Sequence, residues 1–124
     1  MRCVTSVVEM PNTQPTTTSA EKLADKVARA QHRMFCDFAF YVGGTRENVD
    51  EISALENLPG SAGIKVFIGS STGDLLVEDD SGLEKIISKL SRRAAFHSED
   101  EFRLRERVKY QVAGDAASHP VWRD

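Results

Sequence analysis

The sequence predicts an α/β fold built on a parallel sheet. Two patterns alternate along the 124 residues: short β-branched or apolar runs, and longer stretches with apolar residues at helical spacing. The alternation occurs four times, and such a repeat implies parallel strands joined by right-handed crossovers. A flavodoxin-like open sheet and part of a (β/α)8 barrel both fit the pattern. The length is that of one ordinary domain, so we expect residues 1–124 to form a single domain.

Four runs are expected to form the strands. "VTSVVEM" is rich in β-branched residues, and "DFAFYV" is closed by Gly43 and Gly44. "GIKVFIG" is apolar around one lysine, as in a strand buried on both faces. "AAFH" is the last and shortest. The predicted strands therefore cover residues 4–10, 37–42, 63–69 and 94–97.

Helical spacing of apolar residues fills the stretches between and after these strands. Ser19 is expected to cap the first helix, and Ser98 with Glu101 forms a capping-box pattern at the last. Pro59 with Gly60 is a stop signal for the second helix, and Gly114 is one for the last. The predicted helices cover residues 19–33, 47–60, 80–93 and 98–114.

Lys65 is the residue that the pattern leaves unexplained. It lies inside the apolar run "AGIKVFIGSS" of the third strand. A buried lysine is costly unless it is paired, neutral or chemically changed. A lysine in a strand also commonly extends to an edge or pairs with a carboxylate, and this ordinary interpretation stays open.

Polar residues follow the strands at the end where parallel β-α folds carry their functional groups. The first strand is followed by "MPNTQP", the third by "GSSTG", and the fourth ends at His97. His97 could equally be an ordinary hydrogen-bonding residue, and the acidic residues 99–101 are expected to complement a helix dipole. No G-x-x-x-x-G-K-[ST], G-x-G-x-x-G or G-x-S-x-G motif is present, so neither nucleotide binding nor a hydrolase elbow is predicted.

The composition excludes several classes of function. A net charge of −3 gives no electrostatic reason to expect nucleic acid or an anionic membrane as a partner. The mean hydropathy is −0.36, and "MRCVTSVVEM" lacks the apolar core of a signal peptide. Cys3 and Cys36 form no C-x-x-C pair, so we expect reduced thiols in a cytoplasmic protein.

Several stretches together resemble dihydroorotase of the amidohydrolase superfamily. These are "VVEMPNTQPTT", "GIKVFIGSSTGDLLVEDD", "HSEDE" and "HPVWRD", which stand in the family's order. The resemblance implies a (β/α)8 barrel with a metal centre of two zinc ions. In that family the centre activates a water that opens the cyclic amide of dihydroorotate to N-carbamoyl-aspartate, a reaction of pyrimidine biosynthesis. Allantoinase and hydantoinase are near alternatives, and "MPNT" favours dihydroorotase.

The resemblance also implies roles for three residues. Lys65 matches a lysine that reacts with carbon dioxide to form a carbamate, which would turn a costly buried cation into a metal ligand. His97 matches a strand-end histidine that binds the second metal. Asn12, in "MPNT", matches an asparagine that hydrogen-bonds the substrate. His32 and His119 lie at no strand end, and we assign them no ligand role.

Parts of the family pattern do not occur in this sequence. There is no H-x-H, and neither the later histidine ligand nor the aspartate that serves as general base is matched. We therefore expect strands two to five of a barrel, with no catalytic residue and no activity of this chain alone. Two hypotheses remain: a segment of a zinc-dependent cyclic amidohydrolase, or a non-catalytic barrel fragment. Exposed barrel edges would in either case favour self-association.

Overall fold

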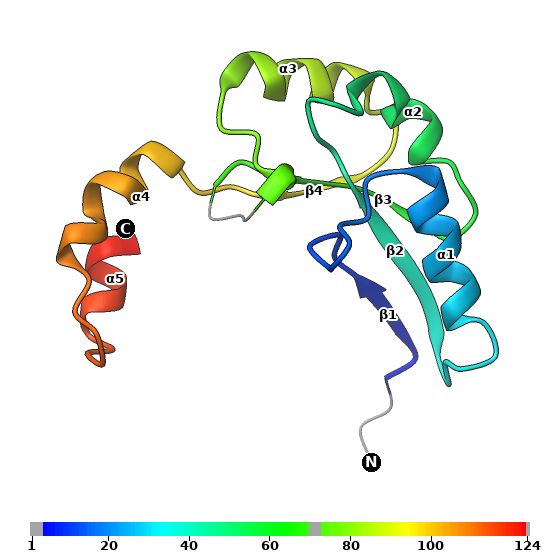
Figure 1. Cartoon of the computed structure of the whole chain (residues 1–124), viewed down its shortest axis with the longest axis horizontal. Coiled ribbons are helices and arrows are strands. Elements are labelled where there is room, and N and C mark those ends of the chain that lie inside the picture. Colours follow the sequence, from blue (N-terminus) through cyan, green and yellow to red (C-terminus); the bar gives the residue numbers. More distant parts are fainter. Residues whose placement is uncertain (1–3, 70–72, 124) are drawn as a thin grey trace.

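A computed structural model describes residues 4–69 and 73–123, and its strands form one parallel sheet (Figure 1). The spatial order is β1-β2-β3-β4, the same as the order along the chain. A flavodoxin-like sheet places its first strand inside the order 2-1-3-4-5, so the observed order favours the barrel segment. The strands are β1 (Ser6–Glu9), β2 (Asp37–Gly43), β3 (Ser61–Phe67) and β4 (Ala94–His97).

Three helices cover the outer, convex side of the curled sheet (Figure 1). They are α1 (Ala20–Ala30), α2 (Ile52–Leu55) and α3 (Asp80–Lys89). The core lies between these helices and the sheet, where amphipathic helix faces meet the outward side chains of β2 and β3. Its buried residues are Leu23, Phe40, Val42, Ile52, Leu55, Ile64, Val66, Val77 and Ile86.

A bulge between β2 and β3 sets which side chains of β3 face outward. Phe40 is opposite Ser61 but Tyr41 is opposite Gly63, so Ala62 is an extra residue. Gly63 has a φ of 129°, and a Cβ there would lie 2.5 Å from the carbonyl oxygen of Arg93. Only glycine fits this conformation and this close approach. Beyond the bulge, the side chains of β3 alternate between the helix-covered face and the inner face.

The predicted strands are confirmed with small shifts at their ends. β3 is buried on both faces as expected, because Gly63 to Phe67 are all buried. β1 differs from the other strands in burial, since all four of its residues are exposed. Ser19 caps α1 as predicted, with its hydroxyl accepting from the backbone N–H of Lys22 at 3.3 Å.

The helix predicted for residues 47–60 is wrong in length. A 3-10 turn, η1 (Val49–Glu51), precedes α2, which ends at Leu55. At the start, the side chain of Asn48 accepts from the backbone N–H of Thr45 at 2.8 Å and holds a turn there. At the end, Arg92 donates to the Glu56 carbonyl at 2.7 Å, so that group is engaged outside the helix.

The helix predicted for residues 98–114 is also wrong in its limits. Asp100, not Ser98, is the N-cap of α4 (Glu101–Arg107), and its carboxylate accepts from the N–H of Arg103 at 3.0 Å. The chain then tightens into η3 (Val108–Tyr110), where β-branched and aromatic residues disfavour α-helix. Gly114, with a φ of 80°, lies in a loop rather than at a helix end.

A last helix, α5 (Ser118–Arg123), was not predicted. It packs against α4 and η3, and residues 101–123 together form an arm beyond the end of β4 (Figure 1). The arm continues the outer row of helices past the β4 edge of the sheet. Its apolar side chains Phe102, Val108, Val112 and Val121 are about half exposed or more.

Two sequence expectations lie outside the described residues. Cys3 and most of the "GSSTG" turn, Ser70 to Thr72, belong to this part of the chain. Cys36 is described and is a free, partly buried cysteine. Across residues 4–69 and 73–123, no helix is long and apolar enough to cross a membrane.

Candidate functional site

Lys65 lies on the inner face of the sheet, away from the helices. Its neighbours in sequence, Ile64 and Val66, belong to the core, so the alternation of β3 turns Lys65 to the opposite side. Gly43 of β2 and Ala95 of β4 stand beside it in the strand register. These small neighbours leave room on the inner face for the long side chain. Only 6% of Lys65 is exposed.

The ammonium group of Lys65 has an unusual environment. Its Nζ lies 4.6 Å from the centre of the Phe67 ring, a cation–π distance. Within the described part of the chain, it makes no hydrogen bond or ion pair. Burial lowers the pKa of Lys65, because desolvation disfavours the charged form. A neutral amine, which is the nucleophilic form, is therefore more accessible here than on an exposed lysine.

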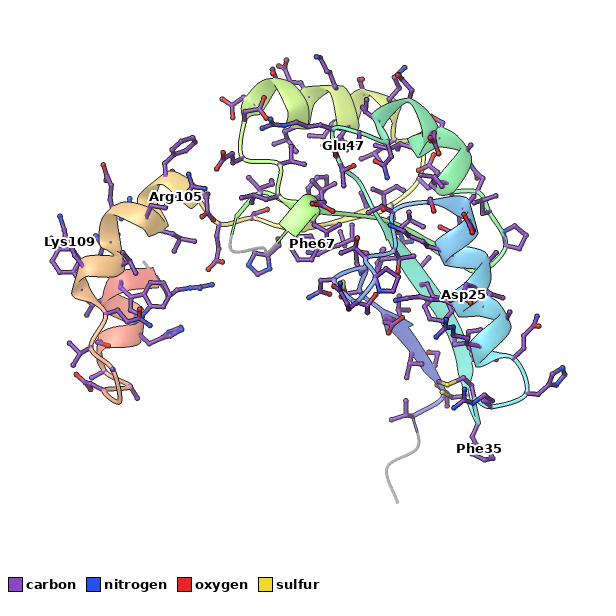
Figure 2. All side chains as sticks on the ribbon, in the orientation of Figure 1. Asp25, Phe35, Glu47, Phe67, Arg105 and Lys109 are labelled. Carbon is purple, nitrogen blue, oxygen red and sulfur yellow. The ribbon has the colours of Figure 1, made fainter. Side chains whose placement is uncertain are left out.

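His97 ends the neighbouring strand, and Phe67 lies between it and Lys65. Phe67 and His97 are paired in the register of β3 and β4, and their rings stack with centres 5.9 Å apart. Phe67 itself lies on the side of the sheet away from α2 and α3 (Figure 2). The backbone N–H of Ile68 donates to the carbonyl of His97 at 2.9 Å. The two strand ends are thus fastened together, and Lys65 and His97 share one face.

Glu99 holds the His97 ring. The Nε2 atom of His97 lies 2.7 Å from Oε2 of Glu99, and Arg123 of α5 contacts the other carboxylate oxygen. Burial acts to raise the pKa of Glu99, but hydrogen bonds from His97 and Arg123 outweigh burial and lower it. An ionised Glu99 accepts a hydrogen bond from the Nε2–H group, which leaves Nδ1 as the nitrogen with a free lone pair in the neutral ring.

Asn12 lies further along the same rim, in the loop after β1. Its side chain is exposed. The loop is closed by a hydrogen bond from the Thr17 N–H to the Pro11 carbonyl at 3.0 Å, and Thr13 donates to the Pro15 carbonyl at 2.8 Å. The structure thus brings Lys65 and His97 onto adjacent strands, while Asn12 follows a strand separated from β3 by β2.

The donor set fits a metal only in part. Within residues 4–69 and 73–123, no group of three or more His, Cys, Asp and Glu side chains could hold a metal ion. A carbamate on Lys65 and the Nδ1 of His97 would add one oxygen donor group and one nitrogen donor, and zinc accepts both types. These two residues therefore suit a metal as two of its ligands.

Sequence reasoning missed two residues that shape this rim. Glu99 was expected to complement a helix dipole, yet it bonds to His97 and Arg123, while the neighbouring Asp100 caps α4. Asn48 is buried and joins three segments, since its amide donates to the carbonyls of Thr18 and Gly43, each at 2.8 Å. The H-x-E spacing was a usable signal for Glu99. Nothing local distinguishes Asn48 from a loop residue.

Comparison with known proteins matches the chain to hydrolases of cyclic amides. A dihydroorotase of Methanosarcina acetivorans is 29% identical over 116 residues, 92% of this chain and 24% of that protein. An L-hydantoinase of Paenarthrobacter aurescens is 28% identical over 98% of this chain and 29% of its own length. A solved structure of the L-hydantoinase (dihydropyrimidinase) from Arthrobacter aurescens superposes with a TM-score of 0.84 and 26% identity, covering 98% of this chain and 28% of that one. No family model matches.

By its fold and these matches, the chain is similar to a segment of the parallel β/α barrel of cyclic amidohydrolases. The predicted partial barrel and the predicted resemblance are both confirmed. The matched proteins that cover most of the chain are named dihydroorotase and L-hydantoinase. The chain spans 24% and 25% of the length of the two dihydroorotases that it matches.

Proposed function

We propose that this chain supplies part of the active site of a metal-dependent cyclic amidohydrolase of the dihydroorotase type. Lys65, as a carbamate, and His97 would be metal ligands, and Asn12 would bind the substrate. The substrate would be dihydroorotate or N-carbamoyl-aspartate, the metal zinc, and the setting cytoplasmic pyrimidine biosynthesis. No general base is assigned within the chain, and residues 1–124 are proposed to act as one domain.

The observation that carries this proposal is the environment of Lys65. A lysine that is 6% exposed, on the inner face, without a carboxylate partner among the described residues, has no evident role in stability. Its desolvated amine and its place one strand from His97 suit a ligand precursor instead. The ordinary alternatives for a strand lysine, an ion pair or an exposed ammonium, do not describe it.

Carbamate formation on Lys65 needs only carbon dioxide. The neutral Nζ attacks the carbon atom, an N–C bond forms, and one C=O π pair becomes a carboxylate lone pair. The nitrogen then releases one proton to solvent, so the product carries one negative charge. The lowered pKa of Lys65 favours the first step, because only the unprotonated amine reacts.

A bound metal would supply Lewis-acid chemistry toward the cyclic amide and toward water. The residues of this chain would do the rest of what is proposed here. Glu99 fixes the His97 ring and its tautomer through the 2.7 Å contact to Nε2. Asn12 presents both a donor and an acceptor, which suits a ring that carries N–H and C=O groups.

Labelled bicarbonate tests the carbamate directly. Protein incubated with carbon-13 bicarbonate should show one carbamate signal by NMR, and Lys65→Met should abolish it. Lys85→Met removes an exposed lysine of α3 and should leave the signal unchanged. Circular dichroism of both variants checks that the fold is retained. A wild-type spectrum without this signal, or a signal that persists in Lys65→Met, would contradict the assignment.

Zinc binding tests the metal part separately. Calorimetric titration should show zinc binding that depends on bicarbonate and is weakened by Lys65→Met and by His97→Ala. Zinc binding that depends neither on bicarbonate nor on Lys65 would refute Lys65 and His97 as a pair of ligands, even if a carbamate forms.

Substrate choice separates dihydroorotate from the hydantoin alternative. NMR shifts of loop 10–18 should respond to dihydroorotate or N-carbamoyl-aspartate more than to hydantoin, and Asn12→Ala should remove the response. A stronger response to hydantoin would favour the hydantoinase alternative.

A further inference from the structure

Three side chains from two distant parts of the chain meet beyond the end of β4. The Nε2 atom of His97 lies 2.7 Å from one carboxylate oxygen of Glu99, and the guanidinium of Arg123, in α5, contacts the other oxygen. All three side chains are partly buried. Partial burial strengthens such contacts compared with those on an open surface, because water and salt screen them less. The carboxylate of Glu99 is therefore held between a histidine and an arginine.

The backbone of Glu99 is fixed against the end of β3. A Cβ at Gly69, two residues after β3, would lie 2.2 Å from the Glu99 carbonyl oxygen, so this close approach requires a glycine. The Ile68 N–H also donates to the His97 carbonyl at 2.9 Å. The Glu99 side chain is less restrained, because its rotatable bonds allow the carboxylate to turn away from His97. A fixed backbone alone does not orient the histidine ring.

Arg123 supplies the restraint that the Glu99 side chain lacks. Its planar guanidinium donates in a fixed geometry, which suits a carboxylate better than an ammonium group does. α5 packs against α4 and η3, and Arg107 of α4 donates to the Val121 carbonyl, so the backbone near Arg123 is anchored. The guanidinium also lies 5.0 Å from the centre of the Trp122 ring. Arg123 therefore contacts Glu99 from a supported position.

We propose that Arg123 is a positioning residue, which orients the His97 ring through the carboxylate of Glu99. With the carboxylate held, the neutral ring keeps its proton on Nε2, where it donates to Glu99, and Nδ1 stays free to bind a metal. The inference rests on the proposed function only for the role of His97 as a ligand. The orientation of the ring can be measured without any metal, so the two proposals can fail separately.

The ordinary alternative is that Arg123 and Glu99 only fasten the arm of residues 101–123 to the sheet. Arg105 offers a matched comparison, since it lies in the same arm and also contacts two carboxylate oxygens, one of Glu78 at 2.7 Å and one of Glu101 at 3.2 Å. These contacts tie α4 to the segment before α3 and do not involve His97. A substitution at Arg105 therefore removes ion pairs of the arm without touching the contact to the histidine.

Nitrogen-15 NMR of the His97 ring tests the positioning in metal-free protein, at a pH where the imidazole is neutral. His97→Gln assigns the ring signals. The wild type should show a hydrogen-bonded Nε2–H and an unprotonated Nδ1. Arg123→Met should abolish the hydrogen-bonded signal and mix the two tautomers, whereas Arg105→Met should leave the ring signals unchanged. Unchanged ring signals in Arg123→Met, or an equal loss in Arg105→Met, would overturn the proposal.

Further variants separate positioning from a loosened arm. Hydrogen exchange of amides 101–107 reports whether either arginine variant loosens the arm. Arg123→Lys keeps a cation that can donate to Glu99, and it should restore part of the ring signal. Once Glu99→Ala has removed the carboxylate, Arg123→Met should cause no further change in the ring signals, because its route to the ring is gone. A further change of the ring in that background would overturn the proposal.

Zinc titration in the presence of bicarbonate connects the ring to the proposed metal site. Arg123→Met should weaken zinc binding about 10-fold, at the lower end of the roughly 10–100-fold loss typical of residues that support a ligand, and Arg105→Met should not weaken it. An altered ring with unchanged zinc affinity would support the positioning by Arg123 and refute His97 as a ligand. An unaltered ring in Arg123→Met would refute the positioning alone, whatever the zinc affinity.

Discussion

Glu56 is a buried carboxylate whose role is structural. It is fully buried at the end of α2 and accepts from the backbone N–H groups of Ser91 and Arg92 at 3.0 and 3.1 Å, and from the Ser91 hydroxyl. These bonds fasten the end of the second crossover to the segment that enters β4. A charge in this position is stabilised because these three donors bond to the two carboxylate oxygens.

We expect Glu56→Gln to destabilise the fold. The amide keeps one oxygen but turns an NH₂ group toward donors, so buried donors lose their partner at a cost of about 1–3 kcal/mol. Urea unfolding at neutral pH measures the loss. Glu51→Gln, the same change at an exposed site on η1, is the control and should be nearly neutral. Equal effects at both positions would show that the bonds to Ser91 and Arg92 contribute nothing.

Glu56 also predicts a pH dependence of stability. Burial acts to raise its pKa, but the hydrogen bonds from Ser91 and Arg92 outweigh burial and lower it. A carboxyl group with a depressed folded-state pKa stabilises the fold above its unfolded pKa, and this contribution is lost as pH falls through the folded value. Stability should therefore decline on acidification more steeply in the wild type than in Glu56→Gln. Parallel urea curves across the acid range compare them, and identical slopes would rule the linkage out.

Asn48 gives a second prediction at the scale of one residue. Its amide donates to two carbonyls and its oxygen accepts from the Thr45 N–H, so all three bonds need an amide in one orientation. Asn48→Asp places a carboxylate oxygen against both carbonyls and should cost more than about 2 kcal/mol. Asn57→Asp is the matched control, because Asn57 is exposed and its side-chain amide donates to the Ser53 carbonyl. Thermal unfolding of the two variants should differ clearly, and comparable melting temperatures would contradict the role of Asn48.

At the scale of elements, the periodicity of apolar residues predicted helices well where tertiary packing buries those same residues. α1 and α3 follow their apolar spacing closely because Leu23 and Ile86 are buried against the sheet. The ends of α2 and α4 were wrong because tertiary contacts decide them: Asn48 and Arg92 limit α2, and Asp100 takes the cap of α4. α5 has too few apolar positions for a helix to be predicted from sequence, and it packs against η3 and α4 while Arg123 contacts Glu99. Local patterns do not carry such information.

The cap of α4 can be tested by two alanine substitutions. Asp100→Ala removes the acceptor of the Arg103 N–H and should destabilise the arm by ~1 kcal/mol. Ser98→Ala should have little effect, since Ser98 is exposed and outside the cap. Hydrogen exchange of amides 101–107 measures the arm without requiring global unfolding. Faster exchange in Ser98→Ala than in Asp100→Ala would restore the sequence-based assignment of the cap.

At the scale of the whole molecule, the sequence predicted which residues lie at the rim better than it predicted the contacts between them. Lys65 was notable in the sequence because a cation in an apolar strand is unfavourable, and in the structure Lys65 is indeed buried. The pairing of His97 with Glu99 and Arg123 could not be predicted, because it depends on α5 returning to the end of β4. Contacts between residues 24 positions apart follow from the fold and not from local spacing.

The same geometry predicts that a polypeptide of these 124 residues, by itself, will not hydrolyse dihydroorotate. A hydrolytic zinc ion is typically held by about three protein ligands with a position left for water. Within the described residues, Lys65 and His97 are the two we propose, and His97 is already held by Glu99 through Nε2. A general base, which contributes roughly 10²–10⁴-fold, is not assigned here either. Protein supplied with zinc and bicarbonate should therefore show no turnover above a Lys65→Ala control in a ring-opening assay. Turnover that depends on Lys65 would mean that the chain completes the site with residues that we have not assigned to it.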